Sequence, residues 1–219
     1  MSKNGKINLI FDATYFGRGY GWLVFRTNGI NIHAKKIETE RIDIILQELF
    51  YLECVGYEFK SFTIDGRTGL CKNLRLHYPN VPVQFCQFHQ KMIIRRYITD
   101  RPKLECSQKL KKLLNKLTKI NEETFKNELE NLEETYKDFL LEKNEKGEFM
   151  HKKLRSALRS LRTNLPYLFT YKNHPELGIS NTTNSIESNF SHWKSKVKMH
   201  RGLRPDRKDK IILYLIKNS

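Results

Sequence analysis

The stretch from residue 7 to residue 37, INLIFDATYFGRGYGWLVFRTNGINIHAKKI, decides the fold. It contains three runs rich in β-branched and aromatic residues, at 7–12, 20–27 and 30–37. Glycines precede the second run, and Asn28-Gly29, a pair typical of tight hairpins, separates the second run from the third. Three strands joined by tight turns predict a sheet that begins antiparallel.

The segment that follows alternates between helical and strand-like patterns. Apolar residues recur at helical spacing from Arg41 to Val55. The elements expected after that helix are a strand at 60–65, a helix at 67–77, a strand at 81–86 and a helix at 88–97. The order β-β-β-α-β-α-β-α predicts an α/β fold with one mixed sheet, in which the first strand lies near the centre beside the fourth.

The pattern becomes purely helical after this alternating part. Leucine and aromatic stripes continue to Leu161, and residues 103–150 are nearly neutral, with 10 Lys/Arg and 11 Asp/Glu. We therefore predict an all-helical insertion at 103–175, between a first core part at 1–102 and a C-terminal part at 176–219. A last helix is expected to begin near Asn184 and to face the sheet with four apolar residues: Ile186, Phe190, Trp193 and Val197.

The charge of the chain is strongly positive and unevenly distributed. The 219 residues carry a net charge of +16, and residues 151–219 hold 15 Lys/Arg against four acidic residues. This density favours an anionic partner, with a solvated basic surface as the alternative.

Four scattered cysteines without a CxxC pair suit a reducing cytoplasm, and no apolar run approaches the roughly 18 residues of a membrane span. We expect a cytoplasmic protein without a membrane partner.

Two aspartates follow apolar strand residues. Asp12 follows LIF at the expected end of the first strand, and Asp65 follows FTI at the end of the fourth. Each alone fits a residue that caps a turn. Together, at the ends of neighbouring strands, two carboxylates about 4 Å apart would repel by roughly 4 kcal/mol unless a cation or proton lies between them. The pair therefore predicts a divalent-metal site.

Glu187 is the third candidate ligand, and it has a local alternative. Asn184-Ser-Ile-Glu187 matches the capping-box pattern, in which the glutamate bonds back to the backbone amide of the N-cap residue. A helix packed on the sheet would instead carry Glu187 on its flank, near the two aspartates. Both interpretations remain open at this level.

Cys86-Gln-Phe-His89 provides half of a zinc-finger ligand set without a second pair. The two residues are interpreted either as a buried thiol with a polar histidine at a helix start, or as part of the same site, with His89 contacting DNA or orienting a metal ligand. Basic residues follow Glu187, at Lys194, Lys196, Lys198, His200, Arg201 and Arg204. Such charges bind phosphates without reading sequence, although a solvated helix face has the same pattern.

Several ordered motifs resemble the catalytic domain of mutator-type insertion-sequence transposases. They are DATYFG, IDGRTGL, PVQFCQFHQ, RYITDRPKL and TTNSIESNFSHWK, and they cover nearly the whole chain. The resemblance implies an RNase H-like fold with a helical insertion before the glutamate. It also implies a DDE triad of Asp12, Asp65 and Glu187 and a Cys-x-x-His element of Cys86 and His89.

The resemblance further implies a reaction and partners. Two Mg²⁺ or Mn²⁺ ions would bind Asp12, Asp65 and Glu187 and support DNA strand cleavage and strand transfer without a covalent protein intermediate. The implied partners are transposon ends and target DNA, and the candidate DNA-contacting residues of this sequence are His89 and the basic residues including Lys194, Lys198 and Arg201. Such enzymes often act as dimers, which adds a homo-oligomer to the expected partners, and no small-molecule substrate is expected.

Members of this family carry an N-terminal DNA-recognition region, whereas this sequence reaches its first expected strand by residue 7. Two other functions follow as alternatives. The first is an inactive transposase fragment that binds DNA or a partner protein. The second is a repair or recombination nuclease that cuts branched DNA and does not need transposon ends.

Overall fold

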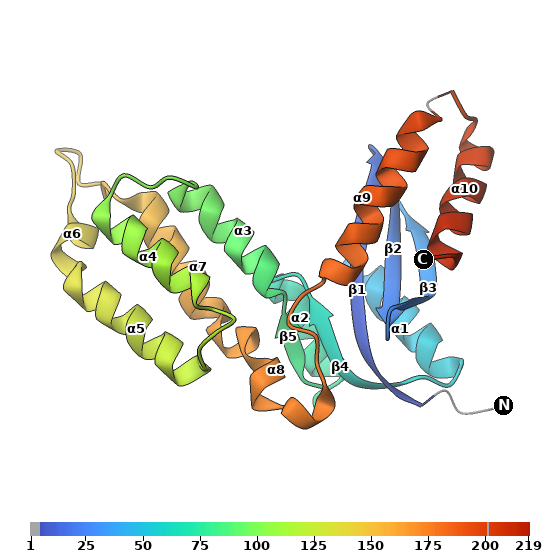
Figure 1. Ribbon diagram of the computed structural model, residues 1–219, viewed down its shortest axis with the longest axis horizontal. Coiled ribbons are helices and arrows are strands. Elements are labelled where there is room, and N and C mark those ends of the chain that lie inside the picture. Colours follow the sequence, from blue (N-terminus) through green and yellow to red (C-terminus); the bar gives the residue numbers. More distant parts are fainter. Residues whose placement is uncertain (1–4, 201) are drawn as a thin grey trace.

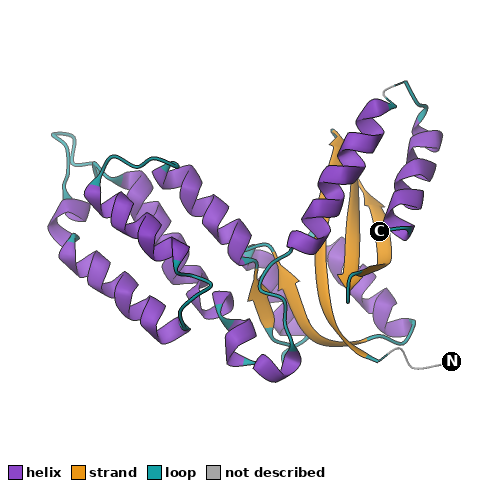
Figure 2. Ribbon diagram, in the orientation of Figure 1, coloured by secondary structure: helices purple, strands orange, loops and turns teal. Residues whose placement is uncertain are grey.

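The computed structural model describes residues 5–200 and 202–219. The first half forms a five-stranded mixed sheet in the order β3-β2-β1-β4-β5 (Figure 2). The strands are β1 (Lys6–Gly17), β2 (Tyr20–Thr27), β3 (Ile30–Ile37), β4 (Glu58–Ile64) and β5 (Val83–Phe85). β1 pairs antiparallel with β2 and parallel with β4. The prediction of a mixed α/β sheet with the first strand central and beside the fourth is confirmed.

The hairpin between β2 and β3 turns where the sequence predicts. Asn28 and Gly29 both have positive φ, of 48° and 79°, which is the backbone that a two-residue hairpin needs and that asparagine and glycine adopt most easily.

The largest difference between a predicted and an observed strand boundary concerns Asp12. The expected strand ends at Asp12, whereas β1 continues to Gly17. The extension arises because β1 keeps its antiparallel partner: Asp12 lies opposite Val24, and pairing continues to Tyr20. Asp12 is therefore a residue within the central strand, and its interpretation as a residue that caps a turn at the strand end is wrong.

Helices cover both faces of the sheet (Figure 1). α1 (Ile42–Cys54) and α2 (Thr68–His77) pack through Leu49 and Leu74 into the larger hydrophobic cluster. The opposite face of β1 and β2 is covered by α9 (Asn184–Met199) and α10 (Pro205–Lys217).

The apolar face of α9 packs against the sheet as predicted. Its four residues, Ile186, Phe190, Trp193 and Val197, are buried with Trp22 and Val24 of β2. The sequence interpretation missed α10, which begins at Pro205, a residue favoured in the first helical turn, and buries Ile212 and Ile216 in the same cluster.

A helical region extends from the β5 edge of the sheet, away from α9 and α10 (Figure 1). It comprises α3 (Gln87–Ile98), α4 (Glu105–Asn115), α5 (Glu122–Thr135), α6 (Lys137–Leu141), α7 (Lys152–Leu168), α8 (Thr170–Asn173) and a 3₁₀ turn at Pro175–Leu177. The only β pairing recorded there among the described residues is an isolated bridge between Lys143 and Phe149. The predicted segment boundaries after residues 102 and 175 stay a prediction.

Buried amides join this helical region to the sheet. Gln84 of β5 and Gln87 of α3 both donate to the backbone carbonyl of Leu168, at 3.0 and 2.8 Å. Asn164 of α7 donates to Gln90 of α3 at 2.8 Å. Because a buried amide left without its partner costs about 1–3 kcal/mol, these bonds fix the orientation of α7 against α3 and β5. No described helix is long and apolar enough to cross a membrane.

Candidate functional site

Asp12 of β1 and Asp65, the residue directly after the neighbouring strand β4, lie at the same level of the sheet. The parallel ladder of β1 and β4 ends with the pair Ile10 and Thr63. Asp12 and Asp65 each follow that pair by two positions, at the point where β4 has ended and β1 continues with β2 alone. The register thus brings the two aspartates together at the carboxyl end of the β1–β4 ladder.

Burial dominates the electrostatics of both aspartates. It raises the pKa of Asp12 to about 7, and the negative charge of Asp65 adds to the rise, against one backbone hydrogen bond from Ala13 at 2.8 Å. Burial also raises the pKa of Asp65, opposed by the positive charges of Arg67 and His89. A carboxylate placed at such cost to its charged form is typical of functional sites, where a cation removes the penalty.

A fourth carboxylate, Glu40, lies near the aspartates and was missed by the sequence interpretation. Its negative charge contributes to the raised pKa values of Asp12 and Tyr15. Glu40 pairs with Arg67 at 2.5 Å, so its charge is compensated within the protein. Nothing in the local sequence ETER distinguishes it, because its position depends on how the end of β3 meets the residues after β4.

The segment before α9 is tied to the sheet and to α3. Thr63 of β4 donates to the carbonyl of Ser180 at 2.9 Å, and the backbone amide of Gln87 donates to the carbonyl of Asn181 at 3.0 Å. These bonds lead the chain across the carboxyl ends of β4 and β5 and start α9 beside them. Glu187 in the first turn of α9 thereby lies near the carboxyl ends of these strands.

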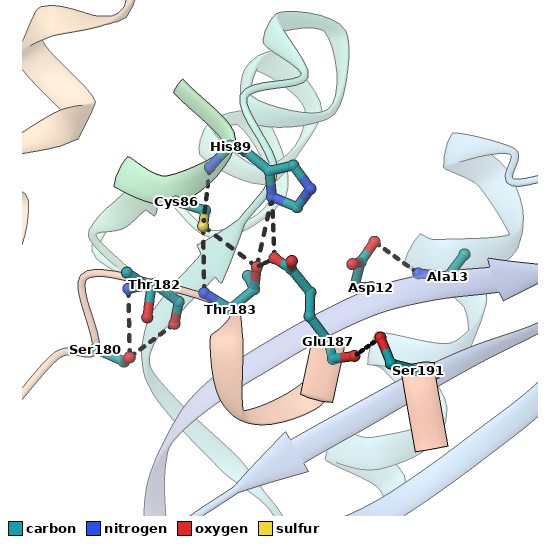
Figure 3. Close-up of polar contacts among 9 residues, drawn as sticks. All are labelled: Asp12, Ala13, Cys86, His89, Ser180, Thr182, Thr183, Glu187 and Ser191. Carbon is teal, nitrogen blue, oxygen red and sulfur yellow. Dashed lines mark hydrogen bonds and ion pairs between the residues drawn. The ribbon is translucent and has the colours of Figure 1, made fainter. Parts of the chain in front are cut away.

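The predicted capping box at the start of α9 is wrong. The N-cap residue is Thr183 rather than Asn184, and its side chain makes no capping hydrogen bond. The carboxylate of Glu187 instead accepts a hydrogen bond from the Thr183 hydroxyl at 2.6 Å (Figure 3). Glu187 thus participates in a cluster between α9 and α3.

That cluster contains Cys86, His89 and Glu187. Their Sγ, ring-nitrogen and carboxylate-oxygen atoms lie within 4.8 Å of one another, close enough for a shared metal ion. His89 Nδ1 lies 3.5 Å from Glu187 Oε1. The hydrogen bond with Cys86 raises the pKa of His89 to about 9, and the carboxylates of Glu187 and Asp12 add to the rise. Although burial raises the pKa of the Cys86 thiol, hydrogen bonds with His89 and Thr183 lower it overall.

His89 connects this cluster with the two aspartates. Its positive charge acts on Asp12 and on Asp65 as well as on Glu187. In Figure 3 the side chains of His89, Glu187 and Asp12 point toward one space, although they come from α3, α9 and β1. Asp12 and Asp65 nevertheless lie outside the group of ligand atoms that meets within 4.8 Å, so the arrangement has two adjoining parts.

The basic residues lie on exposed helix surfaces. Lys194 and Lys198 are exposed on α9, as are Lys196 and the following His200. Arg201 lies outside the described residues. The sequence interpretation overlooked Arg96 of α3, which lines a cavity of about 290 Å³ together with Asp65, Arg67 and His89.

Replacing Asp12 by asparagine should stabilise the metal-free protein at alkaline pH. A folded-state pKa raised from 3.8 to about 7 means that Asp12 costs stability as pH rises through this window. Asp12→Asn removes the cost, so we expect a gain in the free energy of unfolding of about 1–3 kcal/mol at pH 8, and little change at pH 4. Denaturant unfolding in EDTA measures both values.

The exposed Asp43 supplies the control, because Asp43→Asn removes a carboxylate that already bonds with Arg41 and should bring no gain. Mg²⁺ should raise the melting temperature of the wild type more than that of Asp12→Asn. A destabilised Asp12→Asn protein at pH 8 would contradict the interpretation of Asp12 as a strained carboxylate.

The site therefore consists of two partly buried aspartates at the carboxyl end of the β1–β4 ladder and a Cys86–His89–Glu187 cluster beside them, joined electrostatically through His89. No protein-family model matches the chain, and no curated protein matches it significantly in sequence.

Proposed function

We propose that this protein is the catalytic domain of a DDE-type DNA transposase, which cleaves and joins DNA strands with divalent metal ions. The observation that carries the proposal is the placement of Asp12 in β1 beside Asp65, which directly follows the adjacent strand β4, both with pKa values raised by burial. Glu187 comes from a helix packed across the same sheet. The strand order β3-β2-β1-β4-β5 and the helical region between β5 and α9 support an RNase H-like fold of this type.

The donor atoms of the three acids fit Mg²⁺ or Mn²⁺. Both ions prefer carboxylate oxygens, and a cation would remove the penalty that burial places on charged Asp12. Asp12, Asp65 and Glu187 would hold two such ions. The chemistry that these ions supply when bound is activation of a water or a 3′ hydroxyl and stabilisation of the leaving oxygen.

The side chains around the acids have distinct tasks in this proposal. The backbone of Asp12 is fixed by the ladder between β1 and β2, and one oxygen of its carboxylate accepts a hydrogen bond from the Ala13 amide at 2.8 Å. His89 keeps positive charge beside three carboxylates that would otherwise repel one another. The pairing of Glu40 with Arg67 prevents a fourth acid from competing for the cations.

The charge of the chain favours a nucleic acid as the substrate. Exposed lysines lie on the C-terminal half of α9, after Glu187. Arg96 lines the cavity that also contains Asp65. Among the described residues Arg96 has no ion-pair partner, whereas its neighbour Arg95 pairs with Asp100 at 3.5 Å. An unpaired guanidinium beside the acids is suited to a phosphate of the strand that they would cut.

A second candidate is a protein that binds DNA without cutting it, as an inactive transposase fragment would. It is favoured by the position of Glu187, whose contacts are with Thr183 and His89 and not with Asp12 or Asp65. Such a protein would bind DNA with a strong dependence on salt but show no cleavage with Mg²⁺ or Mn²⁺.

Asp12→Asn should abolish Mg²⁺-dependent nicking of DNA while leaving DNA affinity in Ca²⁺ unchanged or increased. The reason is that the variant loses a metal ligand but no phosphate contact. Asp43→Asn, at an exposed position on α1, is the matched control and should cut at the wild-type rate. Gel-resolved nicking of a labelled duplex measures this, and activity retained by Asp12→Asn would refute the catalytic assignment.

Arg96→Ala should weaken DNA binding in Ca²⁺ by about 5- to 30-fold, equivalent to about 1–2 kcal/mol for one lost phosphate contact. Arg95→Ala, one residue away on the same helix, should weaken it far less because Arg95 already pairs with Asp100. Fluorescence anisotropy at several salt concentrations compares the two variants. Equal effects would indicate a diffuse basic surface without a defined phosphate position.

A further inference from the structure

A fully buried threonine hydroxyl lies at the junction of α3 and α9. Thr183 has an exposed fraction of 0%. Its Oγ1 lies 2.6 Å from Glu187 Oε1, 3.3 Å from Cys86 Sγ and 3.5 Å from His89 Nδ1. Its backbone amide also donates to Cys86 Sγ, at 3.3 Å. One side chain therefore touches every member of the Cys86–His89–Glu187 cluster.

These contacts favour a hydrogen-bond centre over a bound transition metal in the cluster. A zinc ion would need ligands at about 2.0–2.3 Å from a point between Cys86, His89 and Glu187. The Thr183 hydroxyl is within 3.5 Å of all three ligand atoms, so the polar atoms of the cluster already have hydrogen-bond partners without an ion. A hydroxyl has one proton to donate, and the shortest of its contacts gives that proton to Glu187.

The cluster holds one oxygen of Glu187 and leaves the other available. Thr183 and His89 both contact Oε1, and among the described residues no partner is recorded for Oε2. Figure 3 shows that the oxygen without dashed lines lies on the side of Asp12. A carboxylate held in this way presents one defined oxygen toward the space that it shares with Asp12.

Thr183 is itself held rigidly. The amide bond to Cys86 fixes its backbone, and the preceding residues are bound to Gln87 and to Thr63. Because threonine is β-branched, its χ1 angle has few accessible values in such a packed position. The hydroxyl therefore keeps its direction without any contribution from solvent.

We infer that Thr183 is a positioning residue that orients the Glu187 carboxylate for metal binding, with Cys86 as the anchor that holds Thr183 in place. The inference rests on the proposed function in one respect, that Glu187 is a metal ligand. It assigns to the Cys86-x-x-His89 element a role in aligning the third acid, and it places no metal in the cluster. Partners that orient a metal ligand typically contribute 10- to 100-fold to metal affinity.

Thr183→Val tests the inference because valine keeps the branched shape and removes the hydroxyl. We expect the dissociation constant for Mn²⁺, measured by isothermal titration calorimetry on the full chain, to rise about 10-fold or more, and Thr183→Ser to restore much of the affinity. Thr182→Val is the matched control, since the hydrogen bonds recorded for Thr182 involve its backbone. DNA affinity measured without divalent metal should be the same in all four proteins.

The outcomes separate this inference from the proposed function. Wild-type Mn²⁺ affinity in Thr183→Val would overturn the inference. So would a thiolate charge-transfer band that appears when wild type is titrated with Co²⁺ and is lost in Cys86→Ser, because it would place a metal in the cluster. Metal binding that depends on Thr183, without any strand cleavage by the wild type, would support the inference and refute the proposed reaction. No Mn²⁺ binding by the wild type would refute both.

Discussion

The parallel register of β1 and β4 is the constraint on which the rest of the site depends. By pairing Ile10 with Thr63 and then separating, the two strands bring Asp12 and Asp65 to one level at the edge of the pair. Burial makes that arrangement unfavourable for two negative charges, and the raised pKa of Asp12 expresses the cost. The hydrophobic contacts on both faces of the sheet hold the strands in this register despite the cost.

The other parts of the site are brought to this edge by α3 and α9. The buried amides Gln84, Gln87 and Asn164 orient the helical region against β5 and α3. The same end of α3 carries Cys86 and His89, which contact Thr183 and Glu187 at the start of α9. An insertion placed between the aspartates and the glutamate in sequence therefore also determines where the glutamate lies. Stability of the helical region and geometry of the site are coupled through α3.

Much of this fold follows from local patterns. The hairpin at Asn28-Gly29, the alternation after residue 41 and the apolar face of α9 are short-range features, and their predictions are confirmed. The end of β1 was predicted wrongly because a charged residue normally ends a buried strand, whereas here pairing with β2 carries the strand past Asp12. The capping box failed for a similar reason, since Thr183 and His89 compete successfully for the Glu187 carboxylate. Glu40 and Arg96 had no local signal, because only the tertiary fold brings them near the aspartates.

The central claim is that Asp12, Asp65 and Glu187 share divalent metal ions, and a crystal structure of the full chain grown with Mn²⁺ tests it most directly. Anomalous scattering locates manganese without assumptions about the site. The account predicts manganese bound at about 2.0–2.3 Å to oxygens of Asp12 and Asp65, with Glu187 contributing its Oε2 atom and Thr183 still bonded to Oε1. Manganese bound at Cys86 and His89, or no manganese at the aspartates, would contradict it.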